Sequence, residues 1–330
     1  MSSDVLLSLI IPFYNVGMHF KPLLDSLSRQ LIEGVEVVLV CDGATDNSLA
    51  VAQQHLAASP SPQRYQLLQQ ANAGVSAARN LGIQHARGSY IGFVDADDVL
   101  LDGYSEQLLS VIRQYQPDLI ELGFKRFVEL PMLSEAKPRY LHRHHGMRSC
   151  MQMAPAVFKA NRWYPWMRVY RKAMAPDFCF PHGVAFCEDL MALPALYQQA
   201  KTLYHLRLPL YGYRVHGSNA TSNVCSEQVE TIRQFSLALE RRQCYQNLPE
   251  LWRSLFQARL AYLLFQLWKD TGRDETMPAV MRRQLQSIAR RHWFRSGLSL
   301  RKKLHLTFPD HFYRLDRRQH KLDCFSGMKN

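Results

Sequence analysis

The stretch "FVDADDVL", residues 93–100, places three carboxylates, Asp95, Asp97 and Asp98, directly after an apolar run. Carboxylates gathered at one point repel one another unless a cation lies between them. Two carboxylates at positions i and i+2 beyond a strand point toward one face, and such hard oxygen ligands suit Mg²⁺ or Mn²⁺. The stretch therefore indicates a divalent-metal site, with the alternative that these residues cap a helix over 98–108.

The elements that must position these carboxylates follow from the hydrophobic pattern. Short apolar runs predict buried parallel strands at 5–13, 35–41, 65–69 and 90–95. Helical patterns separate them at 20–31, 46–58 and 74–86. This alternation predicts an α/β fold with a doubly wound, mostly parallel sheet, in which ligands bind beyond the carboxyl ends of the strands.

The first strand is followed by "IPFYNVG", which excludes two nucleotide-binding motifs. It contains neither G-x-x-x-x-G-K-[ST] nor G-x-G-x-x-G. Both P-loop and dinucleotide-dependent enzymes therefore lose their main support.

Composition limits the class of protein further. The chain has 330 residues and a net charge of +12, and residues 251–330 hold 17 Lys/Arg against 6 Asp/Glu. Seven scattered cysteines without a C-x-x-C pair argue against a disulfide framework and a zinc site, and favour a reducing cytoplasm. No apolar stretch reaches the roughly 20 residues of a membrane-spanning helix, and no signal peptide is evident.

Beyond residue 100 the pattern is less regular. Residues 128–150 interrupt it with prolines and basic residues, which predicts a loop over the active face. The loop contains His142, His144 and His145, whose irregular spacing favours a solvated loop over a metal site. Helices with basic faces are predicted at 228–268 and 278–295.

The chain resembles the family 2 glycosyltransferases of the GT-A fold. Four blocks carry the resemblance in order: "SLIIPFYN" (8–15), "VVLVCDGATDNS" (37–48), "NAGVSAARNLG" (72–82) and "GSYIGFVDADD" (88–98). A fifth is formed by "WMRVYRKAM…FPHGVAFCEDL" (166–190) and "PLYGYRVHGSNATS" (209–222). The resemblance implies a GT-A catalytic domain over 1–220, with a donor half to about 105 and an acceptor half from about 106. A helical, basic C-terminal region would cover 221–330.

The resemblance also implies a metal site that bridges the donor diphosphate. Asp97 would be the direct ligand, with Asp95 near the ribose or also on the metal, while Asp98 has the weakest case. His216 would be a metal ligand or phosphate contact, with a structural histidine as the alternative. The implied cofactor is Mn²⁺ or Mg²⁺.

Residues of the first three blocks would bind the donor nucleotide. Asp42 would accept a hydrogen bond from the uracil N–H, and Arg79 would meet the diphosphate or pair with a nearby carboxylate. Pro12, Tyr14 and Asn15 end the first strand and would lie against base and ribose, although an aromatic there is also ordinary core. Asp46, by contrast, is as readily a helix cap.

The acceptor half would supply the base. Asp189 would take the proton of the acceptor hydroxyl and Glu188 would substitute for it or orient it, unless both simply begin a helix. Acceptor or phosphate contacts are assigned to Trp166, Arg168 and Arg214, with a buried tryptophan as the alternative for the first.

The implied activity is inverting transfer of one sugar from a UDP-sugar to a saccharide or lipid-linked acceptor in bacterial lipopolysaccharide, capsule or exopolysaccharide synthesis. "KANRW" (159–163) lacks the Gln of the Q-x-x-R-W element of processive members, which favours single-sugar addition. The basic C-terminal region suits an anionic membrane surface on the cytoplasmic side, with a solvated face as the alternative, and no motif supports nucleic acid. Other candidates are a sugar-1-phosphate nucleotidyltransferase and a non-catalytic nucleotide-sugar-binding module.

Overall fold

The computed structural model describes residues 5–216, 225–271 and 277–312. These divide into two compact units, the first of residues 1–156 and 162–219, the second of residues 157–161 and 220–330. Within the described ranges, no helix combines the length and apolarity needed to cross a bilayer. The six cysteines in these ranges are all free thiols.

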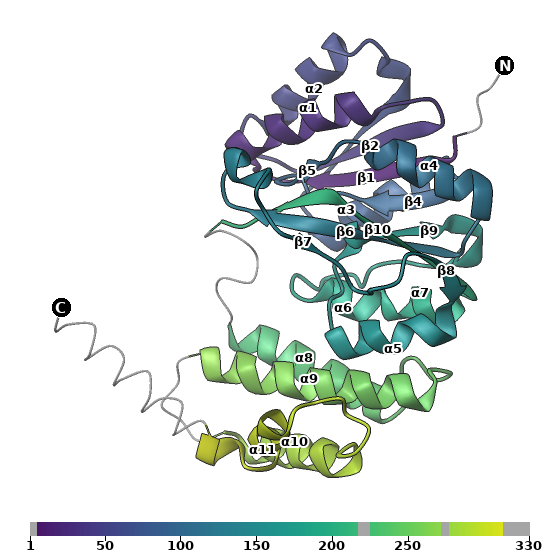
Figure 1. Ribbon diagram of the computed structural model, residues 1–330. Helices are drawn as coiled ribbons and strands as arrows, with labels where there is room; N and C mark the ends of the chain where they lie inside the picture. Colours follow the sequence, from purple (N-terminus) through teal and green to yellow (C-terminus); the bar gives the residue numbers. More distant parts are fainter. Residues whose placement is uncertain (1–4, 217–224, 272–276, 313–330) are drawn as a thin grey trace. The chain divides into compact units, whose positions relative to one another are not determined.

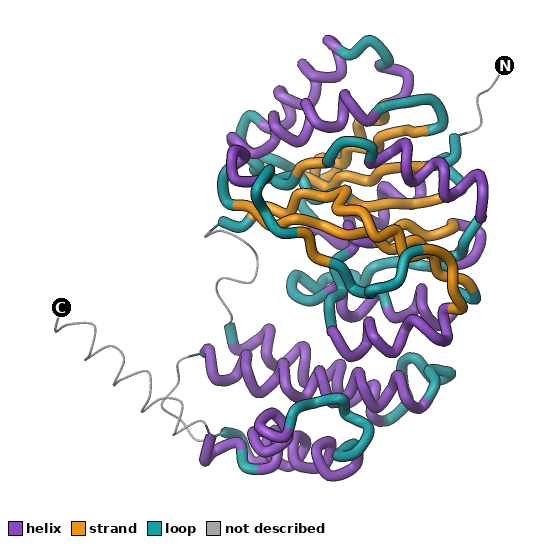
Figure 2. Tube along the Cα trace, in the orientation of Figure 1, coloured by secondary structure: helices purple, strands orange, loops and turns teal. Residues whose placement is uncertain are grey.

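The first unit is built on one sheet (Figures 1 and 2). Its strands are β1 (Leu7–Phe13), β2 (Val35–Asp42), β3 (Tyr65–Gln70), β4 (Tyr90–Phe93), β5 (Val99–Leu100), β6 (Leu119–Phe127), β7 (Pro138–Arg139), β8 (Gly146–Ser149), β9 (Arg168–Arg171) and β10 (Thr202–Arg214). They lie in the order β3-β2-β1-β4-β9-β6-β10-β5, with β7 on β6 and β8 on β10.

The four predicted strands are confirmed as β1 to β4, which pair in parallel. The pair β6 and β10 is also parallel, whereas the short strands β5, β7, β8 and β9 are antiparallel to their neighbours. The predicted α/β fold with a mostly parallel sheet and a helical C-terminal region is therefore confirmed. The predicted loop at 128–150 is wrong in part, because this segment contains β7, which pairs with β6, and β8, which pairs with β10.

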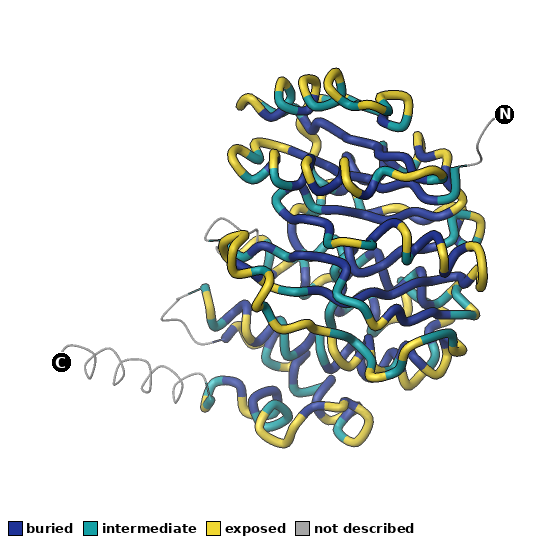
Figure 3. Tube along the Cα trace, turned by 45° about the horizontal axis from the view of Figure 1, so that its top comes forward, coloured by how far each residue is buried: buried dark blue, intermediate teal, exposed yellow. Residues whose placement is uncertain are grey.

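Helices cover both faces of this sheet. They are α1 (Phe20–Gln30), α2 (Ser48–Ala58), α3 (Val75–His85), α4 (Tyr104–Tyr115), α5 (Cys150–Ala160), α6 (Glu188–Ala192) and α7 (Pro194–Gln199). Alternate residues of β1 explain the two layers. Leu9 and Ile11 share one core with α1 and α4, while Ile10 faces α3. A Cβ on Gly82 of α3 would lie 2.3 Å from Ile10, so only glycine allows this close approach. Figure 3 shows the strands buried and the outer turns exposed.

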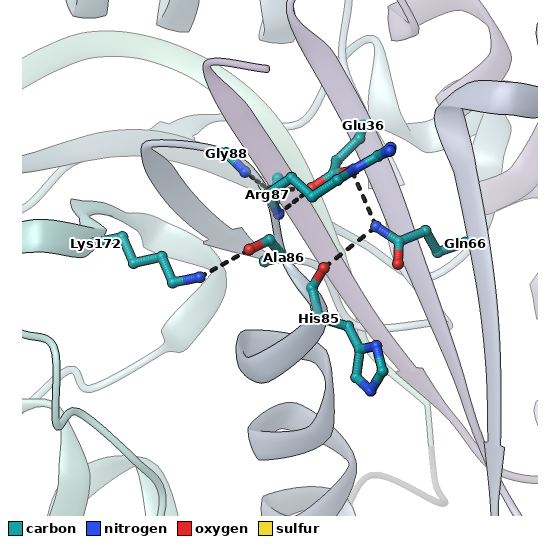
Figure 4. A network of polar contacts seen from close by, with 8 residues as sticks. Glu36, Gln66, His85, Ala86, Arg87, Gly88 and Lys172 are labelled. Atoms are coloured by element: carbon teal, nitrogen blue, oxygen red, sulfur yellow. Dashed lines mark hydrogen bonds and ion pairs between the residues drawn. The ribbon is translucent and has the colours of Figure 1, made fainter. Parts of the chain in front are cut away.

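A saturated polar network closes the amino ends of the strands (Figure 4). The carboxylate of Glu36 is 1% exposed and accepts hydrogen bonds from the Ser8 hydroxyl, the Gln66 amide, and the backbone and side chain of Arg87. Burial alone would raise the pKa of Glu36, but these donors together lower it. The network ties β1, β2 and β3 to the turn before β4.

The second unit contains α8 (Ser226–Glu240), α9 (Glu250–Asp270), α10 (Ala279–Arg291) and α11 (Leu300–Thr307). Helix α9 is buried on most sides, and α8, α10 and α11 each pack against it. The helix predicted over 228–268 is two helices, because the chain turns at 241–249 and Pro249 is the N-cap of α9. Buried Arg253 holds this turn by donating to the carbonyls of Leu239, Tyr245 and Gln246.

Candidate active site

The site lies where β1 and β4 part. These strands pair as far as Ile10 and Phe93, and the Val94 N–H makes one more bond to the Ile10 carbonyl. Beyond this point the chain leaves the sheet as Asp95–Asp98. Its side chains therefore gather at the carboxyl ends of the strands, as predicted.

Asp97 is paired with a histidine from the far end of β10. The Nε2 atom of His216 lies 2.7 Å from a carboxylate oxygen of Asp97, and the two side chains are 21% and 30% exposed. The imidazole of His19 stacks on His216 with ring centroids 5.1 Å apart. The remainder of the fifth block, residues 217–222, lies outside the described residues.

Asp98 has a structural role. Its carboxylate is fully buried and accepts hydrogen bonds from the Tyr211 hydroxyl (2.7 Å) and the Arg214 N–H (2.6 Å). Burial and the charges of Asp95 and Asp97 raise the pKa of Asp98 well above its usual range. The proposed N-cap is wrong, because the following helix α4 begins only at Tyr104.

Arg214 also has a structural role, because it binds the carboxylate segment, residues 95–98. Arg214 is 5% exposed, and its guanidinium donates from Nε to the Asp97 carbonyl (2.8 Å) and lies over the Phe127 ring. The buried hydroxyl of Tyr211 also accepts from the Asp95 N–H. Strand β10 therefore holds the conformation of residues 95–98.

Arg79 connects the donor half to the acceptor half. One terminal nitrogen lies 3.1 Å from an Asp95 oxygen and the other 2.8 Å from a Glu188 oxygen, and the side chain is 5% exposed over the Phe180 ring. The ion-pair alternative is thus what the structure shows for Arg79. Burial first, then the charges of Asp97 and Glu188, raise the pKa of Asp95 against the opposing effect of Arg79.

Asp189 lies beside this bridge at the start of α6. Its carboxylate accepts a hydrogen bond from the N–H of the next residue, Leu190. Burial and the neighbouring Glu188 charge raise the pKa of Asp189 to about 7. Both residues begin a five-residue helix after Cys187, whose φ of 58° is unusual for a residue other than glycine. Such a carboxylate can accept a proton near neutral pH.

Asp42 and Asn15 organise the loops around the same edge. Asp42 accepts from the Gln70 amide and from the N–H groups of Ala73 and Gly74, which fixes the turn before α3. The side chain of Asn15, a residue at φ 47°, accepts a hydrogen bond from the Thr45 N–H and donates one to the Thr45 hydroxyl. The uracil and ribose contacts predicted for these two residues remain proposals.

Tyr14, Pro12 and Asp46 differ in how far they reach solvent. Tyr14 is 48% exposed, whereas Pro12 is buried within β1. The contacts with base and ribose predicted for these two residues stay predictions. Asp46 accepts from the N–H groups of Ser48, the first residue of α2, and of Gly17, which favours the capping alternative.

Two predicted acceptor contacts are core residues instead. Trp166 is 1% exposed and stacks on Tyr164 and Tyr211. Arg168 is also 1% exposed and donates to the Tyr197 hydroxyl and two backbone carbonyls. Neither side chain reaches an acceptor, because the aromatic core accounts for both.

The sequence interpretation missed His19, Gln70 and Tyr211. The latter two have no functional pattern of their own, because their partners Asp42 and Asp98 are distant in sequence. His19 follows "PFYNVGM", and only its contact with His216 distinguishes it.

The donor groups fit a divalent metal that shares its ligands with a substrate. Within residues 5–216, 225–271 and 277–312, no three His, Cys, Asp or Glu side chains form a metal site by themselves. The Asp97 carboxylate and the His216 imidazole nevertheless lie together and partly exposed. Mg²⁺ and similar ions are commonly held by one or two carboxylates with substrate phosphates completing the sphere.

Comparisons with known proteins agree on one family. The sequence profile described as Glycosyl transferase family 2 matches residues 8–141. Glycosyltransferase GlyG of Streptococcus pneumoniae serotype 4 is 32% identical over 222 residues, covering 63% of this chain and 70% of GlyG. The uncharacterized glycosyltransferase EpsJ of Bacillus subtilis is 32% identical over 223 residues, covering 66% and 63% respectively.

A solved structure shows the same fold. The S. aureus TarS fragment 1–349, crystallised in complex with UDP-GlcNAc, superposes with a TM-score of 0.68 at 19% identity, covering 94% of this chain and 87% of that one. The chain spans less than two thirds of the length of three curated relatives that it matches: 63% of EpsJ and 61% of EpsH of Bacillus subtilis, and 64% of YibD of Escherichia coli.

Proposed function

Because the chain belongs to the family 2 glycosyltransferases, we propose that it transfers one sugar from a UDP-sugar to a saccharide or lipid-linked acceptor. The observation that carries the proposal is the Arg79 bridge, which joins Asp95 of the metal-binding segment to Glu188 beside the basic carboxylate Asp189. The Arg79 guanidinium thus connects the carboxylates assigned to the donor with those assigned to the acceptor.

Asp189 is the general base in this proposal. With its pKa raised to about 7, it is substantially ionised at neutral pH and still basic enough to accept the acceptor's hydroxyl proton. The acceptor oxygen forms a bond to the anomeric carbon as the bond from that carbon to the diphosphate oxygen breaks. A single displacement of this kind inverts the anomeric centre.

Asp97 and His216 would hold the divalent metal, Mn²⁺ or Mg²⁺, with Asp95 adjacent. When bound, the metal supplies positive charge that neutralises the leaving diphosphate. On the protein side, Arg214 and Tyr211 keep the carboxylate segment in place, and Tyr14, Asn15 and Asp42 surround the nucleotide. The UDP-GlcNAc complex of TarS supports a UDP-linked donor.

The resemblance supports an acceptor belonging to surface-polysaccharide or lipopolysaccharide assembly at the inner face of the cytoplasmic membrane. The resemblance thus names the class of acceptor, and a screen of UDP-sugars identifies the sugar that is transferred. Thermal stabilisation by each UDP-sugar in the presence of Mn²⁺ would identify the donor, since a ligand stabilises the state it binds.

The test measures the products released from the donor. Release of UDP without pyrophosphate supports the transferase, whereas pyrophosphate release would identify a nucleotidyltransferase, and metal-dependent binding without turnover a binding module. Asp97→Ala should abolish metal-dependent donor binding, and Asp189→Ala should keep binding and lose transfer. Full activity in either variant would contradict the assignment.

A further inference from the structure

The last two described helices form a strongly cationic part of the second unit. Residues 277–312 contain eight Lys/Arg and one acid, Asp310, which pairs with Arg282. In the described part of the chain, neither Arg290 nor Arg295 forms an ion pair. Arg291, the last residue of α10, pairs with Glu240. The charges of Arg290 and Arg295 therefore remain available to attract anions.

Apolar side chains project from the same turn. Phe294 is 94% exposed and Leu300 is 64% exposed, the first between Arg290 and Arg295 and the second directly before Arg301. The residues around them are anchored, since Ser296 and Leu298 are buried and Lys303 lies over the Trp293 ring. We call Arg290, Phe294, Arg295, Leu300 and Arg301 the turn surface. Its phenyl ring has no packing role within the unit.

We propose that the turn surface docks on an anionic lipid bilayer. Arginines at such a surface meet lipid phosphates while exposed apolar side chains enter the boundary between headgroups and acyl chains. Nucleic acid could bind the arginines through its phosphates and stack a base on Phe294, but it would make no specific contact with the aliphatic side chain of Leu300. The inference stands independently of the proposed transferase activity, although a lipid-linked acceptor would lie at the same surface.

The test is co-sedimentation of the full chain with vesicles of phosphatidylcholine alone or with roughly one-third phosphatidylglycerol. The wild type should bind only the anionic vesicles, and less at high salt. Phe294→Ala should weaken binding about tenfold, since burial of its ring is lost. Arg295→Gln should weaken it about fivefold.

Matched controls separate this surface from general charge and hydrophobicity. Val280→Ala removes a 60% exposed apolar side chain elsewhere on α10, and Arg241→Gln removes a cation from the α8–α9 turn. Both should bind vesicles like the wild type. UDP release should be unchanged in Phe294→Ala, which distinguishes failure of docking from failure of the enzyme.

Three results would overturn the proposal. These are equal binding to neutral and anionic vesicles, unchanged binding by Phe294→Ala, and binding of duplex DNA through the same residues by a chain that does not bind anionic vesicles. Because Phe294 is almost fully exposed, its substitution does not disturb the core, and a thermal melt of the variant should superimpose on that of the wild type.

Discussion

The carboxylates at the two ends of the sheet have opposite pKa shifts. At the amino ends, Glu36 receives four hydrogen bonds and its pKa is lowered. At the carboxyl ends, Asp189 receives one from its neighbour's backbone and its pKa is raised to about 7. At Glu36 the four donors outweigh the effect of burial, whereas at Asp189 burial and the charge of Glu188 outweigh the single donor and the charge of Arg79. A fully satisfied carboxylate stabilises the fold, whereas a poorly satisfied one is available for proton transfer.

The largest expected effect is on catalysis. Asp189→Asn should lower the rate of UDP release and sugar transfer by about 10²–10⁴-fold, the usual contribution of a general base, while donor affinity is retained. Steady-state rates and donor titration on the same preparation check this. Glu36→Gln is the control, because a carboxylate of purely structural role should leave the rate per folded molecule unchanged.

A substitution of Glu36 tests the role of the carboxylate at the amino ends of the strands. Glu36→Ala leaves the Ser8 hydroxyl and the Arg87 N–H without their acceptor, and should lower the free energy of unfolding by about 3 kcal/mol. Urea denaturation measures the loss. If the variant instead lost turnover without losing stability, the distinction between the two ends would be wrong.

A pH-dependent gain in stability should accompany the loss of activity at Asp189. A carboxyl with a raised pKa binds its proton more tightly in the folded state, so it destabilises the fold as pH rises from about 4 through about 7. Asp189→Asn should therefore be more stable than the wild type at pH 8 by about 1–2 kcal/mol, after allowance for solvent screening. The difference should shrink toward pH 5, as followed by thermal unfolding at both values.

The smallest effect concerns the neighbour of the base. Glu188→Gln removes a negative charge that raises the pKa of Asp189, so the acid limb of the pH–rate profile should move to lower pH. The profile of kcat between pH 5 and 9 measures the shift. An acid limb that stayed near pH 7 would mean that burial alone sets the basicity.

The sequence predicted the donor half well because its signals are local. Buried apolar runs give β1 to β4, and "DADD" follows the last of them, so topology alone brings Asp42 and Asp95 to one edge. The acceptor half depends on pairs distant in sequence. Arg79 meets Glu188 across 109 residues, and Tyr211 meets Asp98 across 113. Nothing local marks those partners.

The same distance explains the errors. Trp166 and Arg168 have residue types that suit a sugar or a phosphate, but the aromatic layer that buries them is assembled from β6, β10 and α7. The hydrophobic pattern did not predict strand β10, because its pairing with β6 shifts register around Pro209 and interrupts the alternation of buried and exposed residues. A proline signal at 249, by contrast, was available and predicts the break before α9.

The position of β10 also bears on how the protein is made. This strand comes late in the chain yet inserts between β6 and β5, so β6 exposes an unpaired edge until residue 214 has left the ribosome. Exposed edges of this kind invite association with other chains. Tyr211 and Arg214 arrive with the same strand, so a nascent chain cannot set its carboxylate segment before the sheet is closed. The sheet of the first unit and its carboxylate segment are thus completed at the same point of synthesis.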